Sequence, residues 1–217
     1  MKNNLTEIIF ILDRSGSMSG LESDTIGGYN SLLEKQKTNP GKAYISTILF
    51  NTYSEVIHDR LDIHNVPLMS EKDYSAQGCT ALLDAIGGAI KHVGNIHKYA
   101  REEDRPNNTL FIITTDGMEN SSRYYNYENV KNLIEVQKER YGWEFIFLGA
   151  NIDAIEVASR FGISKERAAN YNADSEGTEL NFKIMNEEIQ NLRMNRNISD
   201  DWKNRIDKDY KKRSKKC

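Results

Sequence analysis

Two long apolar runs that end in an aspartate constrain the fold of this 217-residue sequence more than any other feature. Glu7–Asp13 reads EIIFILD, and Asn108–Asp116 reads NTLFIITTD. A near-continuous apolar run of this length is typical of a strand that is buried on both faces of a parallel sheet. Because such a sheet needs helices on both faces, the two runs favour an α/β protein.

Four further segments have strand character. Ala43–Asn51 and Ser54–Ile63 lie two residues apart, which predicts an antiparallel hairpin whose more polar second strand is at an edge. Trp143–Ala150 is another apolar run, and Ala169–Ala173 is a candidate for a short last strand at the other edge. The predicted fold is a doubly wound, mainly parallel six-stranded sheet with one antiparallel edge strand and helices on both faces.

Apolar residues at helical spacing predict five helices between and after these strands. The first follows Ser19 and Glu22, which stand at capping-box spacing, and stops near Pro40. The second begins near Thr80 and contains Gly87-Gly88, a pair that predicts very close packing of this helix on the sheet. The other three helices cover about 127–140, 153–161 and 178–193.

The length fits one α/β domain with an extension. We expect a domain over 1–173 and a C-terminal helical extension with a basic tail over 174–217. Residues 199–217 contain eight Lys/Arg and four Asp, a charge of +4, although the formal net charge of the chain is −3. Acids interrupt this run and no aromatic pattern accompanies it, so a solvated helix end is favoured over a nucleic-acid or anionic-lipid site.

The N-terminus and the cysteines indicate a cytoplasmic protein. MKNNLTE is polar, and the apolar run IIFIL that follows is too short for a signal-peptide core or a membrane span. Cys79 and Cys217 are the 2 cysteines, and a bridge to the last residue is not expected. We expect Cys79 to be packed in the protein. We expect no membrane as a partner. The four histidines are expected at the surface: His58, His64, His92 and His97.

Three polar clusters follow predicted strands or precede a predicted helix. Asp13, Ser15 and Ser17 alternate directly after the first strand, Gly78–Thr80 leads into the second helix, and Thr114–Gly117 ends the second apolar run. In an open α/β sheet, the functional crevice lies at the carboxyl ends of the strands. We therefore expect the three clusters to meet there.

Two carboxylates beside three hydroxyls make a donor set of oxygen alone. No His or thiolate joins it, so Zn²⁺ and Cu fit poorly. Mg²⁺ prefers oxygen ligands, uses one or two carboxylates and keeps several waters. The sequence therefore predicts a Mg²⁺ site with at least one position open to an outside group, Mn²⁺ and Ca²⁺ being alternatives. The predicted ligands are Asp13, Ser15, Ser17, Thr80 and Asp116.

The segments DRSGSM, GCTALLDAIG and TTDGMEN together resemble the metal-ion-dependent adhesion site (MIDAS) of von Willebrand factor A (VWA) domains. That motif is Asp-x-Ser-x-Ser followed by a distant Thr and a distant Asp, and every position is present. The resemblance covers about Glu7 to Ala173, and it is closest to small bacterial members associated with tellurium-resistance and stress clusters. It implies a mainly parallel six-stranded sheet and a metal whose open position takes a carboxylate from a partner protein.

The favoured function is a metal-dependent protein-binding module, and not an enzyme, because no base or nucleophile is evident. The partner is expected to present an Asp or Glu to the metal. Glu119, Asn120 and Tyr124 follow the Asp116 motif and are candidates for the partner-binding face, with a solvated loop or packing of the next helix as the alternative. Asp84, one turn past Thr80, is expected to cap a loop or face solvent.

Two other functions are weighed against this one. In a Mg²⁺-dependent phosphohydrolase, Asp13 would be a strand-end nucleophile. Such enzymes want a second acid two residues later, where this chain has Ser15. A nucleotide-binding Rossmann site is disfavoured because DRSGSMSG contains neither G-x-G-x-x-G nor a G-K-[ST] ending.

Overall fold

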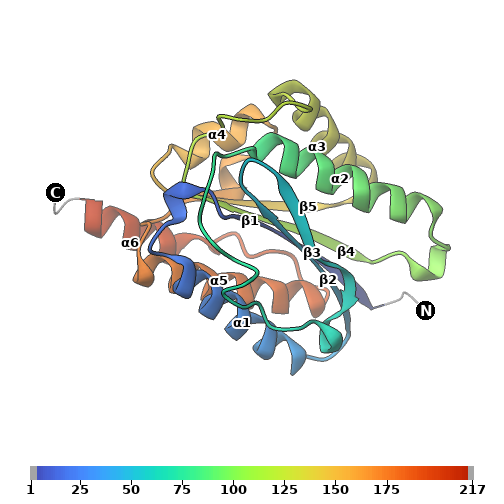
Figure 1. Cartoon of the computed structure of the whole chain (residues 1–217). Helices are drawn as coiled ribbons and strands as arrows, with labels where there is room; N and C mark the ends of the chain where they lie inside the picture. Colours follow the sequence, from blue (N-terminus) through green and yellow to red (C-terminus); the bar gives the residue numbers. More distant parts are fainter. Residues whose placement is uncertain (1–3, 215–217) are drawn as a thin grey trace.

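A computed structural model describes residues 4–214 and contains one six-stranded sheet (Figure 1). The strands are Leu5–Asp13 (β1), Lys42–Phe50 (β2), Ser54–Asp62 (β3), Asn108–Thr115 (β4), Glu144–Gly149 (β5) and Ala168–Asn170 (β6). Their order is β3-β2-β1-β4-β5-β6, and β3 pairs antiparallel with β2 while all other pairs are parallel. The predicted fold class is therefore confirmed.

Helices cover both faces of the sheet. They are Glu22–Lys37 (α1), Leu82–Tyr99 (α2), Tyr127–Tyr141 (α3), Ala154–Arg160 (α4), Ser175–Arg193 (α5) and Asn204–Ser214 (α6). In Figure 1, α2, α3 and α4 lie on one side of the sheet, and α1, α5 and α6 lie on the other. Of the described residues, no helix has both the length and the apolar character that crossing a membrane requires.

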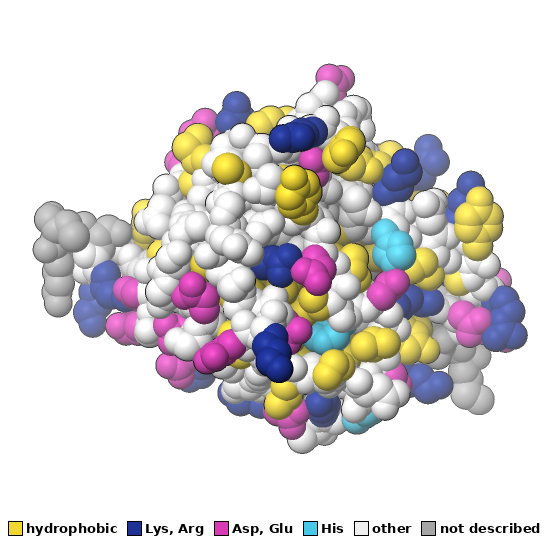
Figure 2. All heavy atoms as spheres, in the orientation of Figure 1, with side chains coloured by type: hydrophobic (Ala, Val, Ile, Leu, Met, Phe, Trp, Pro, Cys, Tyr) yellow, Lys and Arg dark blue, Asp and Glu magenta, His cyan; other side chains and the backbone are white. Residues whose placement is uncertain are grey.

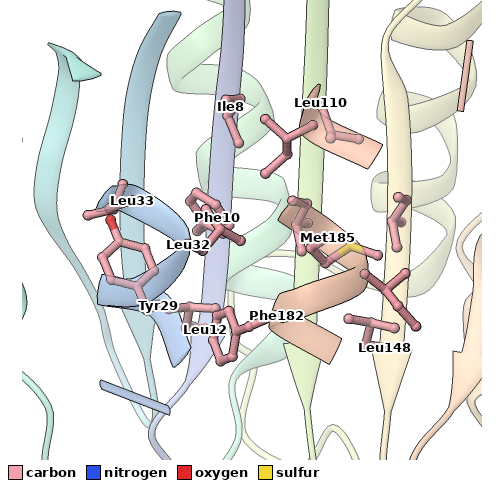
Figure 3. Close-up of a cluster of buried hydrophobic side chains, with 14 of the residues drawn as sticks. Ile8, Phe10, Leu12, Tyr29, Leu32, Leu33, Leu110, Leu148, Phe182 and Met185 are labelled. Atoms are coloured by element: carbon pink, nitrogen blue, oxygen red, sulfur yellow. The ribbon is translucent and has the colours of Figure 1, made fainter. Parts of the chain in front are cut away.

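β1 is buried along its whole length because it lies between these two helix layers. Its alternate side chains enter different cores, as the period of two requires. Ile8, Phe10 and Leu12 pack on the α1 and α5 side (Figure 3), whereas Ile9 and Ile11 pack under α2, α3 and α4. An apolar residue is thus needed at nearly every position, which explains the unbroken run in the sequence.

The residues after 173 pack on the same sheet as the residues before it. Phe182 and Met185 of α5 enter the same core as Phe10 and Leu148 (Figure 3). Before α6, the indole of Trp202 is buried and donates a hydrogen bond to the carbonyl of Glu166 (2.8 Å). The predicted boundary after residue 173 therefore falls between two elements that share one hydrophobic core.

Arg193 joins the end of α5 to the end of α1. Its guanidinium is buried and donates to the carbonyls of Gln36, Asn39 (3.0 Å) and Gly41 (2.8 Å). The carbonyl of Gln36 is in the last turn of α1, where a helix leaves acceptors unpaired, and those of Asn39 and Gly41 lie in the connection to β2. Burial lowers the pKa of Arg193, and the cation is compensated by oriented carbonyl dipoles.

Two local predictions about helices are wrong. Ser19 and Glu22 form no capping box, because Ser19 Oγ donates to the carbonyl of Gly16 (2.8 Å) and α1 begins at Glu22 itself. Gly87 does not mark close packing of α2 on the sheet. A methyl group on Gly87 would lie 2.4 Å from a ring carbon of Tyr125, so the glycine makes room for that ring.

The surface prediction for the histidines is wrong for His58 and only partly right for His97. His58 is buried, and its Nδ1 lies 3.0 Å from Thr47 Oγ1 and 3.2 Å from the hydroxyl of Tyr29. α1 supplies Tyr29 and so covers this part of the edge strand. Half-buried His97 lies 2.7 Å from an oxygen of the fully buried Glu7.

Candidate metal centre

Asp13 ends β1 and is held from two sides. Its Oδ1 accepts a hydrogen bond from the backbone amide of Ser15 (2.7 Å), and its Oδ2 accepts one from Thr115 Oγ1 (2.5 Å). Thr115 is the last residue of β4, the parallel neighbour of β1. The register Leu12↔Thr114 places the ends of the two strands side by side, so their polar termini meet at one edge of the sheet.

The serine hydroxyls bring the first and third clusters together. Ser15 Oγ lies 3.0 Å from Ser17 Oγ, and Ser17 Oγ in turn donates to Asp116 Oδ1. This chain of contacts joins residues that are 99 positions apart in the sequence. The alternation of Asp13, Ser15 and Ser17 thus places all three side chains beside the end of β4, where Thr115 and Asp116 lie.

Thr80 reaches the same point from the loop before α2. A methyl group built on Gly117 would lie 3.1 Å from Ser17 Oγ and 3.3 Å from Thr80 Oγ1. The two hydroxyls therefore flank Gly117, directly after Asp116. The structure brings all five predicted ligands together at the carboxyl ends of β1 and β4.

The loop that carries Thr80 is fixed by both of the other clusters. The carbonyl of Gly78 accepts from the amide of Gly16 (3.0 Å). The amide of Thr80 donates to Asn120 Oδ1 (2.9 Å), and its carbonyl accepts from the amide of Asn120 (3.0 Å). Thr80 is buried, so its hydroxyl is placed before any ligand arrives.

The three candidate partner residues differ in what their side chains do. Glu119 accepts from the amides of Leu83 (3.0 Å) and Ser122 (2.8 Å) and so stabilises the first turn of α2. Asn120 holds Thr80, as described above. Tyr124 is exposed. Their assignment to a partner-binding face stays a prediction.

Four further residues near the centre can be compared with the sequence prediction. Asp84 caps the loop after Ser122 by accepting from three consecutive amides, those of residues 123–125 (2.8, 2.9 and 2.9 Å), as expected. Cys79 is exposed rather than packed. Thr115 and Tyr74 were missed. Tyr74 donates to the carbonyl of Asp13 from a distant loop, and no sequence signal marks it, whereas Thr115 adjoins Asp116.

The electrostatics of the centre favour a bound cation. Burial raises the pKa of Asp13. Burial, and then the charge of Asp13, raise the pKa of Asp116. Among the described residues, neither carboxylate has an ion-pair partner within 4.0 Å, and Asp116 Oδ2 is buried without a hydrogen-bond partner. A divalent cation would compensate both charges and occupy the unpaired oxygen.

The donor set is rich in hydroxyls. Within the part of the chain that the structure describes, no cluster contains three or more His, Cys, Asp or Glu side chains that could hold a metal. The candidate centre has two carboxylates and three hydroxyls, and its assignment as a metal site stays a prediction. These residues fit a divalent cation that prefers oxygen and retains water.

Comparison with known proteins gives structural relatives only. No protein-family model matches the chain, and no curated protein does. Proximal thread matrix protein 1 from the mussel byssus, in a structure with a zinc-occupied MIDAS motif, is 15% identical with a TM-score of 0.57, over 87% of this chain and 46% of its own. A von Willebrand factor type A protein from Catenulispora acidiphila is 16% identical with a TM-score of 0.54, over 85% and 42%.

A third relative has a similar degree of likeness. The ArnB paralog VWA2 from Sulfolobus acidocaldarius is 18% identical with a TM-score of 0.54, over 85% of this chain and 45% of its own. The chain spans less than half the length of each of these three structures. At such identities the likeness shows the fold, and the chain has the VWA fold. The association with tellurium resistance finds no support in these comparisons.

Proposed function

We propose that this protein is a metal-dependent protein-binding module of the VWA type. It holds a divalent cation with Asp13, Ser15, Ser17, Thr80 and Asp116. The observation that carries this proposal is the convergence of five oxygen-bearing side chains at one end of the sheet, one of which, Asp116, has a buried oxygen without a hydrogen-bond partner. Ser17 is exposed, so the centre opens to solvent on that side.

The bound cation supplies a coordination position that a carboxylate from outside can take. This chain orients its own ligands through Thr115, Asn120 and the β1–β4 register. We propose Mg²⁺ because all the donors are hard oxygen atoms. Mn²⁺ and Ca²⁺ remain alternatives, and the zinc-occupied MIDAS motif of a structural relative adds Zn²⁺, which the donor chemistry alone disfavours.

Exposed apolar side chains around the centre support a protein as the partner. Tyr53 (74% exposed) comes from the β2–β3 loop, and Met118 (64%) and Tyr124 (84%) come from the loop between β4 and α3 at this end of the sheet. The first of these loops contacts the Thr80 loop through a hydrogen bond from the amide of Cys79 to Thr52 Oγ1 (3.0 Å). Large exposed apolar side chains beside a polar anchor are characteristic of protein interfaces.

The engagement of Asp13 supports binding over phosphoryl chemistry. Both of its oxygens accept hydrogen bonds, and the side chain is buried. A nucleophile needs an oxygen that is free to approach phosphorus. Ser15 stands where a phosphohydrolase wants a second acid. We therefore propose that the protein is not an enzyme, and that its partner presents an Asp or Glu.

A capture experiment tests this proposal. The immobilised protein is exposed to a native lysate in Mg²⁺ and in EDTA, beside Asp116→Asn as the site variant. Asp59→Asn is the matched control, since it removes one exposed carboxylate on β3. We expect a protein that is retained in Mg²⁺ by the wild type and the control only. Identical retention in EDTA and by Asp116→Asn contradicts the proposal.

A further inference from the structure

A groove lies between α2 and α3 at the end of the sheet opposite the metal centre. Its volume is about 420 Å³. Trp143 and Pro106 line it just before β5 and β4 begin, so it is at the amino ends of the strands. The 8-residue strand β4 spans about 26 Å, which separates the groove from the Asp116 end of the same strand.

The floor of the groove is apolar and rigid. Trp143 is 4% exposed, stacks on Phe111 (5.3 Å between ring centroids) and meets the edge of His97 (5.1 Å). Gly94 of α2 borders this floor, because a methyl group there would lie 3.5 Å from Gln137 Nε2 and 3.9 Å from Trp143 Cη2. Tyr141, which is 62% exposed, supplies apolar surface at the side of the groove.

The rim of the groove is cationic. Lys91, Lys98 and Arg105 line it, and none of the thirteen lining residues is Asp or Glu. This is unusual in a chain with 32 Asp and Glu against 29 Lys and Arg. Lys and Arg side chains lie over α2 and its C-terminal end in Figure 2.

Acids close to the groove in sequence or space have partners elsewhere. Glu103 and Asp104 pair with Arg101 (2.9 and 2.7 Å). Glu7 is fully buried behind His97 and pairs with Arg60 (3.2 Å). Lys98 lies over the ring of Tyr99 (5.2 Å), and Arg105 Nε donates to the carbonyl of Ala100 (3.3 Å). Among the described residues, no ion pair within 4.0 Å neutralises the three rim cations, so their charge can attract an acidic ligand.

We propose that this groove binds a short acidic segment of a partner protein. A large apolar side chain of that segment packs into the groove against Val136 and Tyr141, at the exposed edge of Trp143. Flanking Asp or Glu residues pair with Lys91, Lys98 and Arg105. The volume suits a pocket that holds one anchor residue. Charge complementarity supplies the preference for an acidic segment and speeds association. This site needs no metal, so one molecule of the protein can hold two partners at opposite ends of its sheet.

The test uses random 12-residue peptides displayed on phage. They are selected on the immobilised full-length protein in EDTA, which separates the outcome from that of the metal centre. Two groove variants are compared with the wild type. Lys91→Glu/Lys98→Glu reverses exposed rim charges, and Gly94→Leu places a side chain over Trp143 while removing an unfavourable helix glycine. Lys35→Glu/Lys183→Glu makes the same charge change on the other face of the sheet.

We expect the selected peptides to combine Asp or Glu with an aromatic or large aliphatic residue. A synthetic copy of the strongest should bind both groove variants at least tenfold more weakly than the wild type and bind the control equally. Selection without an acidic bias, or equal binding by both groove variants, overturns the proposal. Sedimentation velocity supplies a further check, because a wild-type dimer that both groove variants dissociate would assign the groove to a second copy of this chain.

Discussion

Asp116→Asn should melt at or above the wild-type temperature without metal and below it with metal. Without metal, Asp13 and Asp116 are two carboxylates whose pKa values are raised by burial, and the charge of Asp13 raises the pKa of Asp116 further. Removing one charge relieves this repulsion. We therefore expect Asp116→Asn to melt at or above the wild-type temperature in EDTA. With metal, the wild type alone should gain stability.

The size of the gain follows from mass action. A ligand at a hundredfold excess over its Kd stabilises the native state by about 2.7 kcal/mol. For a domain of this length, 1 kcal/mol shifts the melting temperature by about 2–4 °C. The wild type should therefore melt about 5–10 °C higher in saturating Mg²⁺. Asp116→Asn lacks a charged ligand, so its shift should be under about 2 °C.

Thermal melts followed by circular dichroism measure both effects. The series covers EDTA, Mg²⁺, Mn²⁺, Ca²⁺ and Zn²⁺, so that the preferred ion is read from the largest shift at equal concentration. Asp59→Asn is again the control, and it should respond to metal as the wild type does. The reasoning fails if no ion moves the wild-type melting temperature, or if Asp116→Asn responds to the same extent.

Three further predictions concern stability. Burial lowers the pKa of His58, so the unfolded chain, in which a His has a pKa of about 6.5, binds the proton more readily than the folded chain. Stability therefore falls as the pH drops below that value. The melting temperature of His58→Gln should fall less between pH 7 and pH 5 than that of the wild type. Arg193→Met leaves three carbonyls without their donor and should lower the free energy of unfolding in guanidinium by about 3 kcal/mol or more. Arg193→Lys should recover part of this loss. A loss under about 1 kcal/mol would contradict the capping role. Gly87→Ala forces the Tyr125 ring to move and should destabilise the protein by about 1–3 kcal/mol. Gly88→Ala places a methyl group that meets nothing within 4 Å and should stabilise the protein by up to about 1 kcal/mol. Equal effects of the two substitutions would refute the steric argument.

Much of the fold was predictable because the sheet is buried on both faces. β1 needs an apolar residue at nearly every position, and that requirement is visible as an unbroken run. The polar second strand of the hairpin showed the sheet edge in the same way. The start of α1 was predicted less well. Ser19 has the chemistry of a cap, but the turn after Ser17 uses its hydroxyl for Gly16, and spacing alone does not distinguish the two.

The convergence of the candidate ligands was predictable because strand ends of a parallel sheet share one edge. Asp13 and Asp116 each follow an apolar run, so knowledge of the fold class placed them together. The residues that hold them were harder to predict. Thr115 donates to Asp13 across two strands, and Tyr74 reaches the same residue from a loop. The first contact depends on the register of two strands and the second on the path of a loop, and neither leaves a periodic signal in the sequence.

The sequence by itself determined the layers, the strand types and which oxygen-bearing side chains are candidate ligands, since each of these follows from periodicity or from residue chemistry at a strand end. Only the tertiary structure decided which polar side chains support other residues. Glu119 and Asn120 look like free loop residues in the sequence, yet both hold the segment of Thr80 and the start of α2. The groove at Trp143 is likewise invisible in the sequence, because its basic rim comes from α2 and a separate loop. A hydrogen bond or a shared surface depends on distance in space, and the packing of α2 and α3 on the sheet sets that distance.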